Sequence, residues 1–261
     1  MKSRFERAVS PVLLGAVPFG VIVVFWWLAP RMFEYPAYML PTTAEVLKRL
    51  GELIQSGELL GSVLSSLGRL LGAFVIGNLI AIPLGILLAM NARVSRVVMP
   101  VAIFLQAVAG IAWAPLAVVW FGIGNVAVTF LVVNSVFFSS LYNTISGVQS
   151  IPLVLWRAMR SMGATRPTLI RELIIPGAMV QLLLGLRTSM ALGWRSLVAA
   201  ELIIGTNGIG FLMMDATKWY GTDTVICGII IIGILWLAFD RFAFEPIERL
   251  TVRRWGLLSN H

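Results

Sequence analysis

The sequence predicts an all-α polytopic membrane protein with six transmembrane helices, and three observations lead to this fold class. Of its 261 residues, 59% are hydrophobic and only 12% are Asp, Glu, Lys or Arg, whereas an average soluble domain has about 25% charged residues. No charged residue occurs from Val97 to Trp156, nor from Ala8 to Pro30. A transmembrane helix needs about 20 mostly apolar residues, so the longer stretch can hold two spans. These runs are continuous rather than alternating, which indicates helices and not the strands of a membrane barrel.

Six spans account for the apolar segments of the chain. Their approximate bounds are 11–30, 62–90, 97–120, 126–148, 177–204 and 223–244. The first follows a basic N-terminus, as the apolar core of a secretory signal does, but a signal core has only about 7–15 residues. This apolar run is longer and ends at Trp26-Trp27-Leu28-Ala29-Pro30. A retained helix is therefore favoured over a cleaved signal.

A further helix is predicted between the first two spans, over residues 42–57. Its apolar residues recur at helical spacing, and charged residues occupy the other face. The apolar residues are Val46, Leu47, Leu50, Leu53 and Ile54. Thr42 or Thr43 is the expected N-cap, and the amphipathic helix is expected to lie at the outer surface of the membrane. A second outer segment, the glycine-rich residues 205–210, is too polar to face lipid and is expected to fold back against the protein.

The distribution of basic residues orients the spans. With the N-terminus in the cytoplasm, thirteen of the twenty Lys and Arg residues fall in cytoplasmic segments, as the positive-inside rule requires. Both termini are therefore expected in the cytoplasm, which agrees with an even number of spans. The formal charge of +8 also invites a nucleic-acid interpretation. Basic residues that lie between apolar segments are explained by orientation, and no nucleic-acid partner is expected.

Several kinds of chemistry are disfavoured by what the sequence lacks. Its one cysteine, Cys227, excludes an internal disulfide, and with one histidine, His261, a His/Cys metal site or a catalytic Cys–His pair is not expected. Cys227 lies in an apolar helix and is expected to be a small buried residue. No Gly-x-x-x-x-Gly-Lys-Ser/Thr phosphate loop occurs, so the chain is not expected to hydrolyse ATP. We expect no catalytic residue, metal or cofactor in this chain.

The longest cytoplasmic segment, residues 151–176, has the pattern of a short docking helix. Pro152 is a favourable residue at a helix start, and Gly163 is a typical residue at a helix end. Leu155, Met159 and Met162 recur at spacings of four and three, which places them on one side of the helix. A short cytoplasmic helix held between spans is well suited to bind another protein.

This segment resembles the loop that marks the ABC importer permeases. That loop reads Glu-Ala-Ala-x-x-x-Gly, followed after nine residues by Ile-x-Leu-Pro. The matching positions are Arg157-Ala158-Met159, Gly163, Leu173, Ile175 and Pro176. Arg157 stands where the family has Glu, and Met159 stands where it has the second Ala. The resemblance implies that residues 152–164 form a coupling helix, which would contact a separate ATP-binding cassette ATPase through residues that include Arg160 and Ala164.

Other segments are similar to the permeases for taurine, aliphatic sulfonates, nitrate and bicarbonate, which belong to the type I binding-protein-dependent importers. These segments include Ser66-Leu67-Gly68-Arg69, Ala112-Trp113-Ala114-Pro115, Ala200-Glu201 and Gly208-Ile209-Gly210, and the match covers about residues 38–256. The family often has prolines just before the Ala-Trp pair. Ala107, Ala109 and Gly110 stand there in this chain, which weakens the expectation of a local helix break.

The resemblance also implies the domain organisation of the chain and the other subunits of the transporter. Residues 1–61 would form a first span and a periplasmic amphipathic helix, residues 62–245 the permease core, and residues 246–261 a cytoplasmic tail. Two permease copies, expected to be identical, would form the pathway in a prokaryotic cytoplasmic membrane. A periplasmic or lipid-anchored solute-binding protein would deliver the solute, and the partner ATPase would use ATP and Mg.

Ionisable residues inside a span are candidates for function, and the fifth span carries Arg187, Arg195 and Glu201. Arg187, Trp194 and Glu201 are spaced by seven and form one stripe, with Arg195 about 80° from Arg187 on the helix. The stripe can line a solute pathway between two protomers, in which guanidinium groups offer forked donors to an anion. Alternatively, the residues of the stripe have a structural role and make ion pairs or helix contacts that satisfy their buried charges. Arg195 is the preferred selectivity residue, and Trp113 in the third span is a further pathway candidate.

The expected solute is a small anion such as a sulfonate, nitrate, bicarbonate or a similar carboxylate. Relatives within the family also import thiamine-precursor pyrimidines or riboflavin, so the same machinery with such a solute is the first alternative. An ion-coupled secondary transporter is a second alternative, although it usually has more spans and this chain has few carboxylates for ion coupling. A membrane enzyme is disfavoured because no catalytic constellation is visible.

Overall fold

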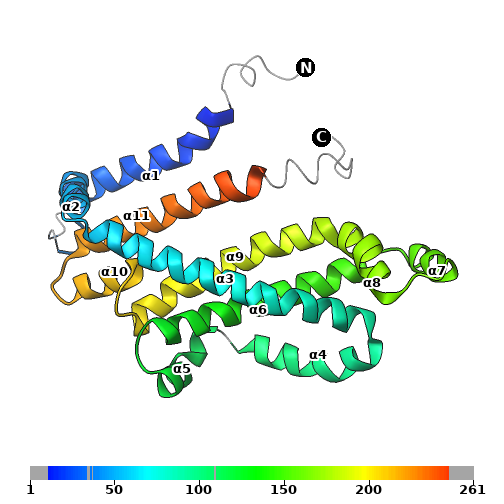
Figure 1. Ribbon diagram of the computed structural model, residues 1–261. Coiled ribbons are helices and arrows are strands. Elements are labelled where there is room, and N and C mark those ends of the chain that lie inside the picture. The colour runs from blue at the N-terminus through cyan, green and yellow to red at the C-terminus, as the bar shows by residue number, and fades with distance from the viewer. Residues whose placement is uncertain (1–10, 34–35, 37, 109, 247–261) are drawn as a thin grey trace, which may run out of the picture.

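The computed structural model describes residues 11–33, 36, 38–108 and 110–246, and among them there are helices, turns and loops but no strand (Figure 1). The all-α prediction is confirmed. The predicted basic N-terminus and nearly all of the C-terminal tail, residues 1–10 and 247–261, lie outside the described residues. The α-helices are α1 (Pro11–Phe33), α2 (Thr43–Gln55), α3 (Glu58–Met90), α4 (Ala92–Ala107), α5 (Ala114–Phe121), α6 (Asn125–Gln149), α7 (Leu153–Ser161), α8 (Arg166–Thr168), α9 (Ile175–Ile204), α10 (Ile209–Thr217) and α11 (Thr222–Phe239). Shorter elements are the 3₁₀-helix η1 (Gly110–Trp113) and the π-helices η2 (Leu169–Ile174) and η3 (Asp240–Phe244).

The long apolar helices confirm a polytopic membrane fold. Among the described residues, four segments are long and apolar enough to cross a membrane: Glu58–Met90, Asn125–Gln149, Arg166–Thr217 and Thr222–Phe244. The bent pair formed by α4 and the η1–α5 segment supplies a fifth if it counts as one span. Within α1, the described apolar stretch Gly20–Pro30 is shorter than a span by itself. Four of the six predicted spans are therefore found in α3, α6, α9 and α11, and the bent pair stands where the third is predicted. The first predicted span falls on α1, and its crossing of the membrane stays a prediction.

The third predicted span, residues 97–120, is not one continuous helix. α4 ends at Ala107, and the chain bends by 89° before it continues as Gly110–Phe121. Val108 has extended backbone angles (φ −74°, ψ 112°), which do not continue a helix. Gly110 lies so close to α6 that a Cβ atom there would be 2.8 Å from Ser135 Oγ. The break forms without the prolines that the family often has, so the expectation drawn from their absence is wrong.

The centre of the molecule consists of α3, α6 and α9, with α6 packed along both of the others (Figure 1). Glycines let these helices approach closely. A Cβ atom at Gly85 would lie 2.8 Å from Thr144 Cβ, and one at Gly185 would lie 2.5 Å from Asn143 Cβ. Small residues at helix contacts are a general device of membrane bundles, because lipid provides no hydrophobic drive for helices to associate. The residues in the middle of the shared core include Leu70, Val132, Val136, Met190 and Trp194.

The predicted amphipathic helix between the first two spans is confirmed as α2. Thr42 is its N-cap: the Thr42 hydroxyl accepts a hydrogen bond from the backbone N–H of Glu45, and the Glu45 carboxylate accepts one from the backbone N–H of Thr42. Val46 and Leu53 are buried in a cluster with residues of α10 and α11. The Cys227 thiol donates to the backbone carbonyl of Val46 (3.4 Å), so this cysteine is the small buried residue that the sequence predicts.

A buried polar network joins α3, α9 and α10. The Arg69 guanidinium on α3 lies 2.8 Å from the Glu201 carboxylate on α9, and the two side chains are 8% and 0% exposed. The Ser66 hydroxyl lies 2.8 and 2.9 Å from the two carboxylate oxygens. The backbone N–H of Gly210 donates to the same carboxylate (2.9 Å), and the backbone N–H of Ile209 donates to Ser66 (3.0 Å). A buried charge is tolerated only with such pairing and hydrogen bonding.

The glycine-rich residues 205–210 fold back against the protein, as the sequence predicts, and close this network. Arg69 donates to the Asn207 backbone carbonyl (2.8 Å) and to the Asn207 side-chain oxygen (2.6 Å). Gly208 has φ +105°, a conformation that favours glycine, and a Cβ atom there would overlap the Glu201 carboxylate. The loop therefore needs glycine at this position both for its backbone conformation and for the space that the carboxylate occupies.

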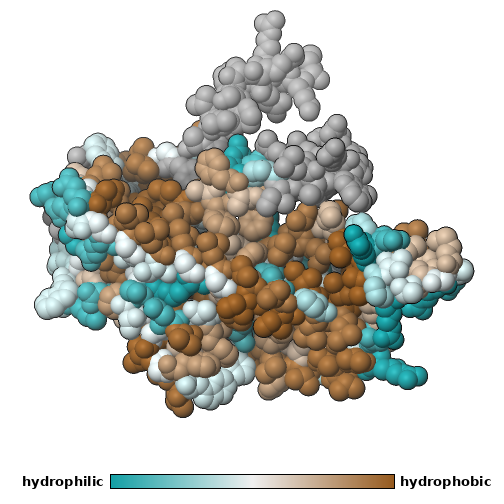
Figure 2. Space-filling model, in the orientation of Figure 1, coloured by the Kyte–Doolittle hydropathy of each residue, from teal (hydrophilic) through white to brown (hydrophobic). Residues whose placement is uncertain are grey.

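The face of the molecule in Figure 2 is mostly apolar in its middle and more polar at its two ends. Exposed apolar side chains lie along α1, α3, α4 and α11, for example Val21, Leu79, Phe104 and Ile234. Hydrophilic residues gather at the end that carries α2 and at the end that carries α7 (Figures 1 and 2). This distribution is the one that a bilayer requires of a spanning protein.

Gly85→Ala is predicted to lower the free energy of unfolding by about 1–3 kcal/mol, because the added methyl group would press against the Thr144 side chain on α6. Gly72→Ala on the same helix is the matched control, since a Cβ atom there meets nothing within 4 Å. Thermal unfolding of the two variants in detergent, followed by tryptophan fluorescence, compares them. Equal effects of the two substitutions would contradict the close approach of α3 and α6.

Glu201→Ala is predicted to destabilise the protein by about 3–5 kcal/mol, because it leaves the buried Arg69 charge without its partner. The double variant with Arg69→Ala should be less destabilised than the sum of the two single variants. Asp215→Ala is the control, since it breaks an exposed pair with Lys218, and such pairs contribute at most about 1 kcal/mol. Additive single effects in unfolding experiments would show that Arg69 and Glu201 are not coupled.

Candidate functional site

The short helix α7 lies at one end of the molecule, beyond the central helices (Figure 1). Pro152 is its N-cap residue, and Gly163 ends it with φ +79°, in the left-handed region. The backbone N–H of Gly163 bonds to the Arg160 carbonyl, and that of Ala164 bonds to the Met159 carbonyl, each at 3.0 Å. This pair of bonds is the Schellman motif, which satisfies the last carbonyls of a helix. The helix end that Gly163 predicts is therefore present, with its bounds fixed by hydrogen bonds.

Apolar side chains lie on both the inner and the outer sides of α7. Trp156 and Met159 pack against the buried cluster at this end of the molecule. Leu153 and Val154 face outward and are 69% and 73% exposed. Exposed apolar side chains gathered on a short helix at a polar end of the molecule are typical of a protein-binding surface.

The predicted coupling residues divide between these two sides. Arg157 and Ala158 are exposed. Met159 packs inward, and the Arg160 guanidinium lies over the Trp156 ring, 5.9 Å from its centre. The exposed side of α7 therefore combines a positive charge with small and apolar side chains.

Pro176 lies in the first turn of α9, although the sequence places it just before this span. Proline lacks an N–H group, and its ring clashes with the carbonyl four residues earlier in a regular α-helix. The preceding element, η2, is a π-helix, in which the Ile175 N–H bonds to the Ile170 carbonyl five residues earlier. This wider turn accommodates the proline. As a result, α8, η2 and α9 form one helical path from the α7 end into the membrane core.

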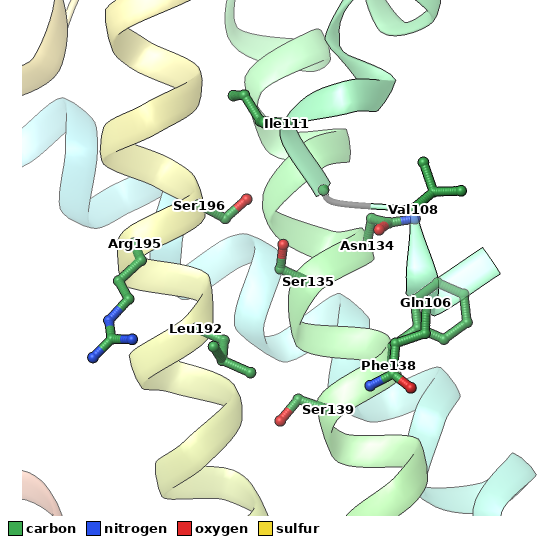
Figure 3. Close-up of a pocket in the computed structure, with 11 residues that line it drawn as sticks. Gln106, Val108, Ile111, Asn134, Ser135, Phe138, Ser139, Leu192, Arg195 and Ser196 are labelled. Carbon is green, nitrogen blue, oxygen red and sulfur yellow. The ribbon is translucent and has the colours of Figure 1, made fainter. Parts of the chain in front are cut away.

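A pocket of about 390 Å³ lies where α4 breaks, between α6 and α9 (Figure 3). Its polar lining consists of Gln106, Asn134, Ser135, Ser139, Arg195 and Ser196. In Figure 3 the Ser135, Ser139 and Ser196 side chains project into the space between α6 and α9, whereas the Arg195 guanidinium extends away from these hydroxyls on the other side of α9. A site for a small polar molecule typically has a few hydroxyl and amide groups within apolar walls.

Arg195 is exposed, and within the described part of the chain it has no ion pair or hydrogen bond. A guanidinium group offers five donors in a planar fork that fits the oxygens of an anion. The side chain that the sequence identifies as the best selectivity candidate therefore lies beside a polar pocket with its donors available.

Arg187 lies elsewhere on α9 and has a carboxylate partner. Its Nε atom donates to Asp240 Oδ1 (2.8 Å) and its Nη2 atom to Asp240 Oδ2 (2.7 Å). This forked pair joins α9 to η3, at the end of α11. The contact favours the structural interpretation of Arg187 over a pathway role.

The rest of the predicted stripe also faces the protein interior. Trp194 is 6% exposed within the central core, and Glu201 is held in the network with Arg69. Trp113 ends η1 and packs against the same core, and it is absent from the lining of the pocket. Of these predicted pathway residues, Arg195 lines the pocket, and Trp113, Trp194 and Glu201 do not.

Several pocket residues are missing from the sequence-based set of candidates. Ser135 and Ser139 occur four residues apart in an apolar span, and this helical spacing of hydroxyls is a signal that could have identified them. Gln106 and Ser196 carry no such signal, because their contribution depends on the break in α4 and on the rotation of α9. Within the described residues, no cluster of His, Cys, Asp and Glu side chains is suited to hold a metal ion.

The comparisons with known proteins agree with this architecture. Residues 81–244 match the family described as the binding-protein-dependent transport system inner membrane component. The taurine transport system permease protein TauC of Escherichia coli is 32% identical over 229 residues, which cover 86% of this chain and 83% of that protein. The putative aliphatic sulfonates transport permease protein SsuC of Bacillus subtilis is 31% identical over 223 residues, which cover 85% and 81%.

Two further comparisons extend this picture. The bicarbonate transport system permease protein CmpB of Synechococcus elongatus is 31% identical over 180 residues, which cover 69% of this chain and 65% of that protein. A chain of the MetNI methionine ABC transporter in an inward-facing conformation has a similar fold, with a TM-score of 0.59 and 20% identity over 72% of this chain and 95% of that chain. The fold, the family match and the relatives agree, and the chain belongs to the binding-protein-dependent transport system inner membrane components, the permeases of ABC importers.

Proposed function

We propose that this ABC importer permease forms a solute pathway as a homodimer and passes a small anion, such as a sulfonate, nitrate, bicarbonate or a similar carboxylate. The observation that carries the proposal is the unpaired Arg195 at the rim of a hydroxyl-lined pocket. The names of the relatives support the same class of solute, since they refer to taurine, aliphatic sulfonates and bicarbonate. As a member of this family, the chain is a multi-pass membrane subunit of a transporter and is not an enzyme by itself.

The helix α7 is proposed to couple this chain to a separate ATP-binding cassette ATPase. Arg157, Ala158 and the exposed residues Leu153 and Val154 would enter a groove on that subunit. The inward-facing Met159 and the Schellman turn at Gly163 would hold the helix in a fixed orientation. ATP and Mg would be bound by the ATPase, and this chain would transmit the motion.

The proposed orientation places the α7 end in the cytoplasm of a prokaryotic cell, with both termini on that side. It is supported by charge, because residues 91–175 contain six arginines and only one carboxylate, Glu172. The opposite end, with α2 and α10, would face the periplasm. A periplasmic or lipid-anchored solute-binding protein would deliver the anion there.

Ala158→Leu is predicted to reduce co-purification of the ATPase subunit at least severalfold, because a larger side chain on the exposed side of α7 would not fit the partner's groove. Leucine suits a helix nearly as well as alanine, so the permease itself should keep its unfolding temperature. Ala92→Leu, also exposed and at the same end of the molecule, is the matched control. Undiminished ATPase binding, or uptake by the purified chain alone driven by an ion gradient, would contradict the proposed coupling.

Arg195→Ala is predicted to raise the KM for uptake of the anion about tenfold or more, since a hydrogen bond to a charged group contributes about 1.5–3 kcal/mol. Arg195→Lys should restore part of this loss, because it keeps the charge but not the planar fork. Uptake of radiolabelled taurine, nitrate and bicarbonate into vesicles measures the effect, with assembly and ATP hydrolysis checked separately. Arg241→Ala, which removes an exposed arginine paired with Glu245, is the control. An unchanged KM for every anion tested would exclude Arg195 from the pathway.

A further inference from the structure

A second pocket, of about 720 Å³, lies at the α7 end of the molecule between the last turns of α3 and the α8–η2 segment. Its apolar wall consists of Pro83, Ile86, Leu87, Met90, Leu169 and Ile170. Pro83 and Met90 are seven residues apart on α3, so this wall extends about 10 Å along the helix. Leu87 is 48% exposed, so the wall is open to the surroundings. The pocket therefore has the lining of an open groove that suits an apolar chain.

Two arginines also line this groove. Arg160 and Arg166 complete the lining together with Asn91 and Ala164, and no carboxylate is among the lining residues. Within the described part of the chain, neither arginine forms an ion pair. The cation–π contact with Trp156 holds the Arg160 guanidinium near the groove.

The charge around the groove is one-sided. Between residues 91 and 175 there are six arginines and one glutamate, which gives a net charge of +5. Figure 2 shows that hydrophilic residues at the α7 end border the apolar surface of the membrane helices. The groove thus lies where a lipid headgroup meets its acyl chains, and its charge is complementary to an anion.

We propose that this groove binds one anionic phospholipid of the cytoplasmic leaflet, a placement that rests on the proposed orientation of the chain. The lipid phosphate lies against Arg160 and Arg166, and an acyl chain lies along the wall from Pro83 to Met90. A free phosphate ion would use the arginines but not the apolar wall, and a zwitterionic lipid would bring a further positive charge next to the two arginines. Basic pockets between helices at the cytoplasmic side are suited to acidic headgroups.

Phosphatidylglycerol binding by the full-length chain, purified with the subunits that accompany it and titrated in detergent by native mass spectrometry, tests the proposal. Arg166→Gln is expected to weaken binding about fivefold, as expected for one basic residue near an anionic headgroup. Arg166→Lys, which keeps the charge, should bind nearly as well as the natural chain. Arg171→Gln is the matched control, because Arg171 is exposed at the same end but does not line the groove.

The apolar wall is tested separately on α3. Leu87→Gln should weaken phosphatidylglycerol binding severalfold, whereas Leu79→Gln should not, because Leu79 is 73% exposed on the same helix but lies outside the groove. Equal retention of phosphatidylcholine, equal competition by soluble glycerol phosphate, or an equal loss in Arg171→Gln would each overturn the proposal. So would binding that is seen only after the ATPase subunit has been removed, since that subunit would then occupy the groove. Anion uptake is a separate measurement, so either proposal can fail alone.

Discussion

The buried ion pair between Arg69 and Glu201 is the constraint on which the arrangement of the helices depends. Separating two buried charges costs several kcal/mol, so α3 and α9 must meet at this point, and the loop before α10 must fold over it. The pair also sets the rotation of α9. With Glu201 facing α3, Trp194 two turns earlier faces the core, and Arg195, about 100° further round the helix, faces away from it. The position of Arg195 beside the pocket therefore follows from the contact that Glu201 makes near the end of α9, six residues later.

Features that depend on nearby residues could be predicted from the sequence. The Thr42 cap of α2, the end of α7 at Gly163 and the long apolar helices each have a local signal, and the structure contains all of them. Features that depend on distant residues could not. Arg187 pairs with Asp240, which is 53 residues away, and the break after α4 brings Gly110 close to Ser135 on α6. The spacing of Arg187, Trp194 and Glu201 places them on one stripe of α9, but spacing alone does not tell whether a stripe faces a pathway or the core.

Five of the arginines fall into two groups by their surroundings, and the difference between the groups is informative about function. Arg69 and Arg187 are each matched by a carboxylate on another helix, so their charge is used to hold helices together. Arg195, Arg160 and Arg166 form no ion pair within the described residues and line pockets instead. Unpaired guanidinium groups beside polar or apolar cavities are available to ligands. One set of residues thus builds the scaffold, and the other provides candidate contacts for an anion and for a lipid.

The distance in sequence between Arg69 and Glu201, about 130 residues, has a consequence for synthesis. α3 enters the bilayer when Glu201 has not yet been made, and chain elongation at about 5–20 residues per second leaves an interval on the order of ten seconds. During that time an arginine with no partner is held in a nascent helix, and inserting an arginine costs at most about 2.5–3.5 kcal/mol, the value for the helix centre. The long apolar sequence of α3 offsets this cost. The apolar residues of α3 are therefore needed for insertion at the translocon as well as for contact with lipid in the finished protein.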